Sequence, residues 1–136
     1  VNEDMERRKK VRIAVDIVNT LAANEYEEIF TINAFTGEPV VYKEGISKVI
    51  EEQNKVGFKL GVENYMKTYC MDENPEQTAK ELNLDYVKEQ LENNNTYQKI
   101  YSIMDENNNI KMKRAFYTYL NKHKDTIVCT IMEVGK

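Results

Sequence analysis

The alternation of apolar and polar residues in the last third of the chain predicts three consecutive β-strands. Residues 97–104, 110–120 and 126–134 either place apolar side chains at alternate positions or are rich in β-branched residues. Patterns of this kind, bounded by turn formers, are typical of half-buried strands. The polar segments 105–109 and 121–125 suit hairpin connections. We therefore expect a three-stranded antiparallel meander whose apolar face packs on a second layer.

The middle run indicates which side of this sheet faces the core. Ile110, Met112, Phe116 and Leu120 share one parity, and Arg114 lies among them. We expect this parity to point toward the interior, where a charge has to be paired. The partner of Arg114 would be a bound anion or a carboxylate from the helical layer.

Two more strands are expected upstream, at residues 28–34 and 39–43, joined by a tight turn in which Gly37 is available for positive φ. Pro39 cannot donate a backbone hydrogen bond and is expected at a strand start or sheet edge. Between residues 44 and 95 the apolar spacing lengthens to three and four residues, which predicts a run of short helices.

Four helices are expected in this middle region. The first ends near Gly57 and the second follows Gly61. Asn74 and Pro75 form a helix-start signal, in which Gln77 would reach back to the cap. The last helix begins after Asp85. Their apolar positions are Ile46, Val49 and Ile50, then Val62, Tyr65, Met66, Tyr69 and Cys70, and finally Val87 and Leu91.

The chain opens with a predicted helix over residues 5–23. Its first turns are nearly all charged, after which Val11, Val15, Val18 and Leu21 or Ala22 form one apolar stripe. We expect this stripe to mediate a parallel homodimer. Acidic Glu3, Asp4 and Glu6 directly precede the basic residues at 7–12, which favours a solvated helix face over a phosphate or membrane patch.

Composition narrows the class of protein. The chain has 136 residues, 41% of them hydrophobic and 31% charged, which fits one soluble globular domain. Its net charge of −4 argues against a general nucleic-acid binder. No apolar run is long enough to span a membrane and no signal segment opens the chain, so we expect a cytoplasmic protein. Cys70 and Cys129 lie far apart in apolar settings and are expected to be reduced, buried residues.

The order of helix, two strands, short helices and three strands indicates an α+β fold with one antiparallel sheet covered on one face. Several segments in this order resemble a PAS domain of the divergent kind that precedes diguanylate cyclase (GGDEF) or histidine kinase output domains in bacterial signalling proteins. They are residues 21–33, Thr36-Gly37-Glu38, residues 70–76, which take the place of the family's His-Pro-Glu-Asp segment, and the closing Ile131-Met132-Glu133-Val134.

The resemblance implies a five-stranded antiparallel sheet of order 2-1-5-4-3 with short helices on one face. It also implies a dimerisation or linker helix at 1–23, a single domain at 24–136 and a fused output domain. The family's Asp-Ile-Thr exit triplet is replaced by Glu133-Val134-Gly135, which puts the capping role of that triplet in doubt.

No cofactor, metal or catalytic residue is expected. Cys70 lacks the Asn-Cys-Arg-Phe-Leu-like context of the flavin photosensors of this fold. The lone histidine, His123, lies between Lys122 and Lys124 in a polar hairpin tip, where solvent exposure is expected rather than haem ligation. Acidic groups such as Glu25, Glu27 and Glu28 are expected to face water.

A small-molecule site is one interpretation of the aromatic residues, because phenols and a guanidinium can hold a small carboxylate in an apolar pocket. The alternative is that these residues are ordinary core and sheet surface. Three functions follow: a sensory module controlling a fused domain, a ligand-free dimerisation spacer, and a small enzyme of the ketosteroid-isomerase type, which needs a buried acid or base. The candidate ligand-binding residues are Arg114, Tyr65, Tyr69, Tyr101 and Phe116.

Overall fold

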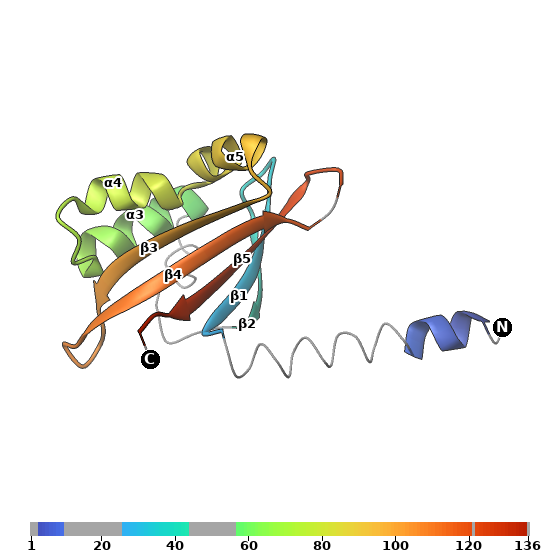
Figure 1. The fold of residues 1–136 in the computed structure, drawn as a ribbon, viewed down its shortest axis with the longest axis horizontal. Coiled ribbons are helices and arrows are strands. Elements are labelled where there is room, and N and C mark those ends of the chain that lie inside the picture. The colour runs from blue at the N-terminus through green and yellow to red at the C-terminus, as the bar shows by residue number, and fades with distance from the viewer. Residues whose placement is uncertain (1–2, 10–25, 44–56, 121, 136) are drawn as a thin grey trace.

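The computed structural model of the protein describes residues 3–9, 26–43, 57–120 and 122–135. Its centre is a five-stranded sheet of order β2-β1-β5-β4-β3, in which every neighbouring pair is antiparallel (Figure 1). This confirms the predicted α+β class, the strand order and the three-stranded meander. The strands are β1 (Glu28–Asn33), β2 (Pro39–Lys43), β3 (Thr96–Met104), β4 (Ile110–Tyr119) and β5 (Thr126–Glu133).

Three helices cover one face of this sheet and lie between β2 and β3 in the chain (Figure 1). They are α3 (Phe58–Tyr69), α4 (Pro75–Leu82) and α5 (Leu84–Asn93). A further helical segment spans residues 3–9, and its side chains are exposed. Within the described ranges, none of the helices combines the length and apolar character that crossing a bilayer requires.

The helix starts follow the predicted signals only in part. Asn74 is the N-cap of α4, and its side-chain oxygen accepts a hydrogen bond from the backbone N–H of Gln77 at 3.2 Å. The Gln77 side chain does not reach back to the cap and instead donates to Glu81. Gly57, with φ of 90°, is the N-cap of α3, so this helix begins a turn before Gly61. The start of α5 at Leu84 places Asp85 in its first turn, where a negative charge complements the helix dipole.

The turn between β1 and β2 forms as its residues suggest. The Asn33 side chain accepts hydrogen bonds from the backbone N–H groups of Phe35 and Thr36 at 2.8 and 3.0 Å. Gly37 then adopts φ of 75°, a left-handed conformation that glycine enters without a steric penalty. The Lys88 side chain of α5 donates to the carbonyl of Ala34, which ties this turn to the helical layer.

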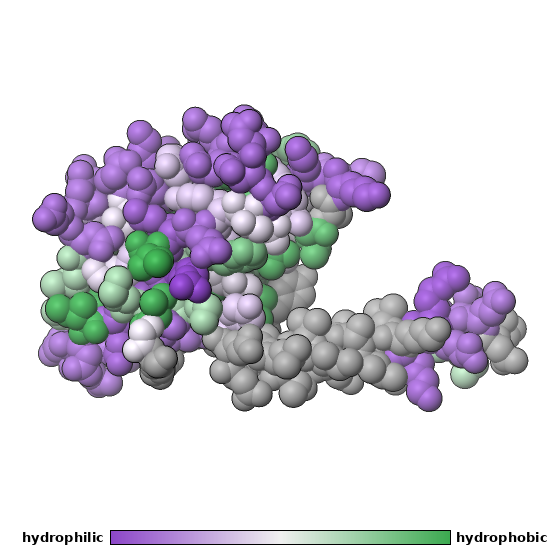
Figure 2. All heavy atoms as spheres, viewed as in Figure 1, coloured by the Kyte–Doolittle hydropathy of each residue, from purple (hydrophilic) through white to green (hydrophobic). Residues whose placement is uncertain are grey.

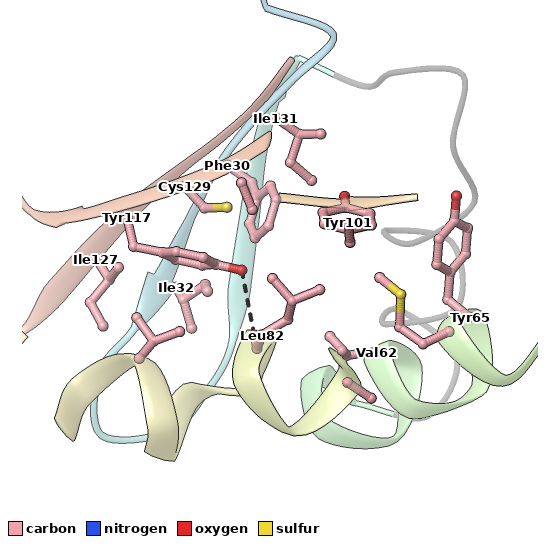
Figure 3. Packing of buried hydrophobic residues seen from close by; sticks show 14 of the residues in the cluster. Phe30, Ile32, Val62, Tyr65, Leu82, Tyr101, Tyr117, Ile127, Cys129 and Ile131 are labelled. Atoms are coloured by element: carbon pink, nitrogen blue, oxygen red, sulfur yellow. Dashed lines mark hydrogen bonds between the residues drawn. The ribbon is translucent and has the colours of Figure 1, made fainter. Parts of the chain in front are cut away.

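The assignment of β4 residues to the two faces was wrong. The buried positions of β4 are Lys113, Ala115 and Tyr117, while Arg114 and Phe116 lie on the face away from the helices. The register with β5 explains this, because Tyr117 lies opposite Cys129, which is completely buried. Both parities of β4 are apolar, so its own pattern could not decide the face. Figure 3 shows the result, with Tyr117 among the side chains packed against the helices.

The connection from α3 to α4 covers part of the β3 edge. Cys70 forms an isolated bridge with Ile103, and the Met71 N–H donates to the Ser102 carbonyl at 2.9 Å. Asp72 then accepts hydrogen bonds from the Ser102 N–H and hydroxyl at 3.1 and 2.8 Å. The segment that resembles a PAS motif is therefore a structural edge cover, which reduces the pairing capacity of an exposed strand.

Two predicted features lie outside the described residues. One is the apolar stripe of residues 11–22, and the other is the short helix around Ile46, Val49 and Ile50. The proposed boundary between a linker at 1–23 and a domain at 24–136 also falls there, so these features stay predictions.

Candidate functional site

The sheet separates the five predicted ligand-binding residues into two groups. Tyr65 and Tyr69 of α3 and Tyr101 of β3 lie on the helical side, where the core forms. Arg114 and Phe116 lie on the opposite face. The predicted set therefore does not form one site, and the three tyrosines remain as the interior group.

The interior tyrosines come from two layers of the fold. The rings of Tyr65 and Tyr69, one helical turn apart, have centroids 4.9 Å apart. Tyr65 and Tyr101 are both 3% exposed, and Figure 3 shows their hydroxyls projecting in the same direction between the sheet and α3. Phenols are amphipathic, so an interior rich in them offers polar atoms in an otherwise apolar layer.

Charged groups are buried beside these tyrosines. Glu28 of β1 is 1% exposed and Lys113 of β4 is 7% exposed. The Lys113 ammonium donates to the Glu27 carboxylate, with Nζ and Oε2 2.6 Å apart. A charge is rarely buried unless it is paired, because removing it from water is expensive. We call Glu27, Glu28, Tyr65, Tyr101 and Lys113 the interior polar cluster.

Strand alternation explains why these charges point inward. Glu28 shares its parity with Phe30 and Ile32, which belong to the core. Lys113 likewise shares its parity with Ala115 and Tyr117. Since side chains alternate between faces along a strand, packing the apolar members of each strand carries the charged members inward.

The register brings the members of the interior polar cluster together. Lys113 lies directly opposite Tyr101 on β3 and Glu133 on β5. Glu133 forms an ion pair with Lys111 at 3.3 Å, next to the buried pair of Lys113 and Glu27. The cluster therefore spans β1, β4 and β3, with α3 packed over it.

The interior environment changes the acidity of its groups. Burial, followed by the negative charge of Glu28 and the proximity of Tyr65, raises the pKa of Tyr101 well above its usual value. Burial also raises the pKa of the Tyr117 phenol and of the Cys129 thiol. These phenols and this thiol stay protonated at neutral pH, so the phenols remain available as hydrogen-bond donors.

This arrangement suits binding more directly than metal chemistry. It offers phenol donors, an ammonium group and carboxylate acceptors between two packed layers, a combination that can orient a small polar molecule. No group of three or more histidine, cysteine or acidic side chains suited to a metal ion occurs in the described parts of the chain. His123 is exposed at the β4–β5 hairpin, as predicted.

The expectation for the cysteines is confirmed in part. Both are free, and Cys129 is completely buried. Cys70 is half-buried, because it belongs to the segment that covers the β3 edge rather than to the centre of the core.

The expectation that Glu28 faces water was wrong, whereas the Glu27 side chain is 22% exposed and pairs with Lys113. Lys113 was not singled out as a site residue. A signal existed in the sequence, because Glu28 and Lys113 each stand two residues before a buried member of their own strand. Reading them as surface charges relied on residue type alone. In a strand, parity with apolar neighbours is the stronger indicator.

Comparison with protein-family models and with curated proteins yields no match for this chain. The fold and the chemistry of the interior polar cluster are therefore the features that indicate a function for this chain.

Proposed function

We propose that the chain is a PAS-like sensory module of a bacterial signalling protein, which binds a small polar molecule at the interior polar cluster and controls a fused output domain. A diguanylate cyclase is the proposed output domain, and the proposed setting is cytoplasmic. The module itself performs no catalysis in this proposal. The order 2-1-5-4-3, with helices inserted between β2 and β3, supports the PAS-like part of it.

The observation that carries the proposal is the buried Lys113, which pairs with Glu27 and lies opposite Tyr101. An interior that served only for stability would gain more from apolar side chains, since buried ion pairs contribute little net stability compared with hydrophobic replacements. Burial also raises the pKa of Tyr101, and ionisable groups with perturbed pKa values are more frequent at functional sites. A ligand with hydrogen-bonding groups would use the atoms that make this interior polar.

Native mass spectrometry of the freshly purified chain tests this proposal. The intact mass is compared with the mass of the same sample after denaturation, so that a retained molecule appears as an excess lost on unfolding. We expect an excess in the wild-type chain and in the Lys111→Met variant, because Lys111 is a more exposed member of the same strand face. The excess should disappear in Tyr101→Phe, which removes one phenol oxygen and keeps the ring.

A ligand bound elsewhere would survive the Tyr101→Phe change and would contradict the assignment of the site. If neither the wild type nor any variant shows an excess of intact mass, a second measurement tests whether the chain binds a ligand at all. Thermal unfolding of the wild type is then screened against small carboxylates and amines. Stabilisation by none of them would refute the sensory proposal, because a ligand that binds the native state must raise its stability.

A second candidate function is a ligand-free dimerisation spacer of the same fold. The apolar face of the sheet opposite the helices favours it, because several large apolar side chains are exposed there. Both candidates include a homodimer formed through the N-terminal helix. Sedimentation of a Val15→Glu, Val18→Glu double variant tests that shared part, and a variant that stays dimeric would contradict it.

A further inference from the structure

A cleft lies on the solvent side of the helical layer, between α3, α4 and α5. It has a volume of about 810 Å³ and is lined by residues of these helices and of the junction between α4 and α5. No member of the interior polar cluster lines it, so the two sites are separate. Figure 2 shows hydrophilic residues gathered over the helical layer. The volume lies in the upper part of the range of about 300–1,000 Å³ that is usual for small-molecule sites.

The wall of this cleft contains a buried amide oxygen without a partner. Asn83, at the junction of α4 and α5, lines the cleft and is 9% exposed. Its Oδ1 atom is buried and accepts no hydrogen bond from the described part of the chain. Asparagine is a preferred N-cap residue, yet the Asn83 side chain makes no capping hydrogen bond to α5. A buried acceptor without a donor is unfavourable, so this oxygen does not stabilise the ligand-free chain.

The backbone holds Asn83 in place at the edge of the cleft. Its N–H donates to the Lys80 carbonyl at 3.3 Å, and its carbonyl accepts from the Val87 N–H at 3.0 Å. The terminal torsion of an asparagine side chain is soft, so the amide can turn toward the cleft while the backbone stays fixed. A primary amide offers an acceptor and a donor side by side, which match the N–H and C=O groups of a peptide bond.

Charged side chains of both signs surround this amide. Those of α5 are acidic, Asp85 and Glu89, whereas on α3 Lys59 and Lys67 stand on either side of Glu63. α4 adds one charge of each sign. Lysine and glutamate four residues apart on a helix can form an ion pair, but within the described ranges Glu63 pairs with neither lysine. The α5 side of the cleft therefore suits an ammonium group, and the lysines of α3 suit a carboxylate.

We propose that this cleft binds a short free peptide through its backbone and its two charged ends. The Asn83 amide pairs with a peptide bond of the ligand. The ammonium end lies beside Asp85 and Glu89, and the carboxylate end lies beside Lys59 and Lys67. A free amino acid has both charged ends but no peptide bond for Asn83. This site is additional to the interior polar cluster and does not rest on the proposed sensory function.

NMR titration of the isotope-labelled full chain with trialanine tests this site. Trialanine has the peptide bonds and both charged ends, and it carries no other polar group. We expect saturable shifts of backbone amide signals in α3, α4 and α5. Trialanine that is acetylated and amidated at its ends keeps the peptide bonds, and L-alanine keeps the charged ends. Each should bind at least about tenfold more weakly than trialanine, because each lacks part of the matching set of groups.

Three variants test the residues in named roles. Asn83→Ala should weaken trialanine binding about tenfold, because the peptide bond loses its partner. Asn94→Ala, at the exposed C-terminal end of α5 and outside the cleft, is the matched control and should bind trialanine as the wild type does. Glu89→Gln should weaken binding of trialanine but not of its N-acetylated form, which has no ammonium group. Without peptide, Asn83→Ala should keep the urea midpoint of the wild type, because the buried oxygen has no hydrogen bond to lose.

Several outcomes would overturn this proposal. One is the absence of saturable shifts with trialanine at millimolar concentrations, and another is shifts confined to residues outside the three helices. Equal binding by the wild type and Asn83→Ala would do the same. A loss of stability in Asn83→Ala as large as that in Asn74→Ala would assign Asn83 to the fold instead of to a ligand. Tyr101→Phe should bind trialanine as the wild type does, so failure of the interior ligand site and failure of the cleft are distinguishable.

Discussion

Replacing Lys113 with methionine tests whether the interior polar cluster depends on its buried cation. Methionine retains much of the apolar stem of lysine and removes the ammonium group. The Glu27 carboxylate would then lose a partner 2.6 Å away. Removing one member of a buried ion pair costs about 3–5 kcal/mol.

The expected loss is smaller because the pair is not fully enclosed. The side chain of Glu27 is 22% exposed, so water stabilises its carboxylate in part. We expect Lys113→Met to lower the free energy of unfolding by about 2–3 kcal/mol. Lys111→Met is the matched control, since Lys111 lies two residues away on the same face. Its side chain is 36% exposed, and its ammonium lies 3.3 Å from the carboxylate of Glu133. Its expected loss is about 0–1 kcal/mol.

Urea denaturation followed by circular dichroism measures both losses. With a slope of about 2 kcal/mol per molar urea, Lys113→Met should lower the urea midpoint by about 1–1.5 M and Lys111→Met by at most about 0.5 M. Adding Glu27→Gln to Lys113→Met should recover part of the lost free energy of unfolding, because the partly buried side chain at position 27 then carries no charge. Equal losses in the two lysine variants would refute the reasoning from burial. No recovery with Glu27→Gln would show that the loss does not come from the separated charge.

Three further predictions concern the sheet edge, the buried phenols and a helix cap. Burial raises the pKa of Asp72, but the hydrogen bonds from Ser102 and Thr78 outweigh it and hold the pKa below its usual value. The stability that these hydrogen bonds to the ionised Asp72 contribute is present above the pKa of Asp72 in the unfolded chain, and it is lost as pH falls through its pKa in the folded chain. Asp72→Asn should therefore flatten the decline in the free energy of unfolding below about pH 4. A variant whose stability declines in acid as steeply as that of the wild type would contradict this. Burial raises the pKa values of Tyr101 and Tyr117 in the folded chain, so the stability linked to the neutral phenols is present below their pKa in the unfolded chain and is lost as pH rises through their pKa in the folded chain. In an alkaline absorbance titration, these two phenols should therefore ionise only as the chain unfolds. Asn74→Ala should lower the free energy of unfolding by about 1 kcal/mol in urea denaturation, whereas Asn94→Ala, at an exposed helix end, should cost less.

Local chemistry made much of the fold predictable. Gly37 adopts the positive φ that its turn requires, and Asn74 caps α4 through its side chain. The strands of the meander end within a residue of their predicted bounds, because Asn-rich and Lys-rich turns interrupt the apolar pattern sharply. These features depend on contacts between residues close in sequence, which a single chain can display directly.

The site was less predictable because it depends on long-range register. Tyr117 and Phe116 are neighbours with similar apolar character, and only the pairing with β5 decides which of them is buried. The same pairing sends Lys113 inward and Arg114 outward. Sequence reasoning found the three interior tyrosines but joined them to Arg114, which the sheet separates from them.

The alternation along β4 also connects the interior polar cluster with the opposite face of the sheet. Lys113 belongs to the interior polar cluster, and the next residue, Arg114, is the one charge on the described outer positions of β4. Because consecutive side chains in a strand point to opposite faces, a shift of β4 that accommodates a ligand beside Lys113 must also move Arg114 on the face away from the helices. Packed layers transmit such displacements because they have few voids to absorb them. A ligand at the interior polar cluster and a partner bound at Arg114 would then bias the same strand, which is the physical requirement for coupling between two sites.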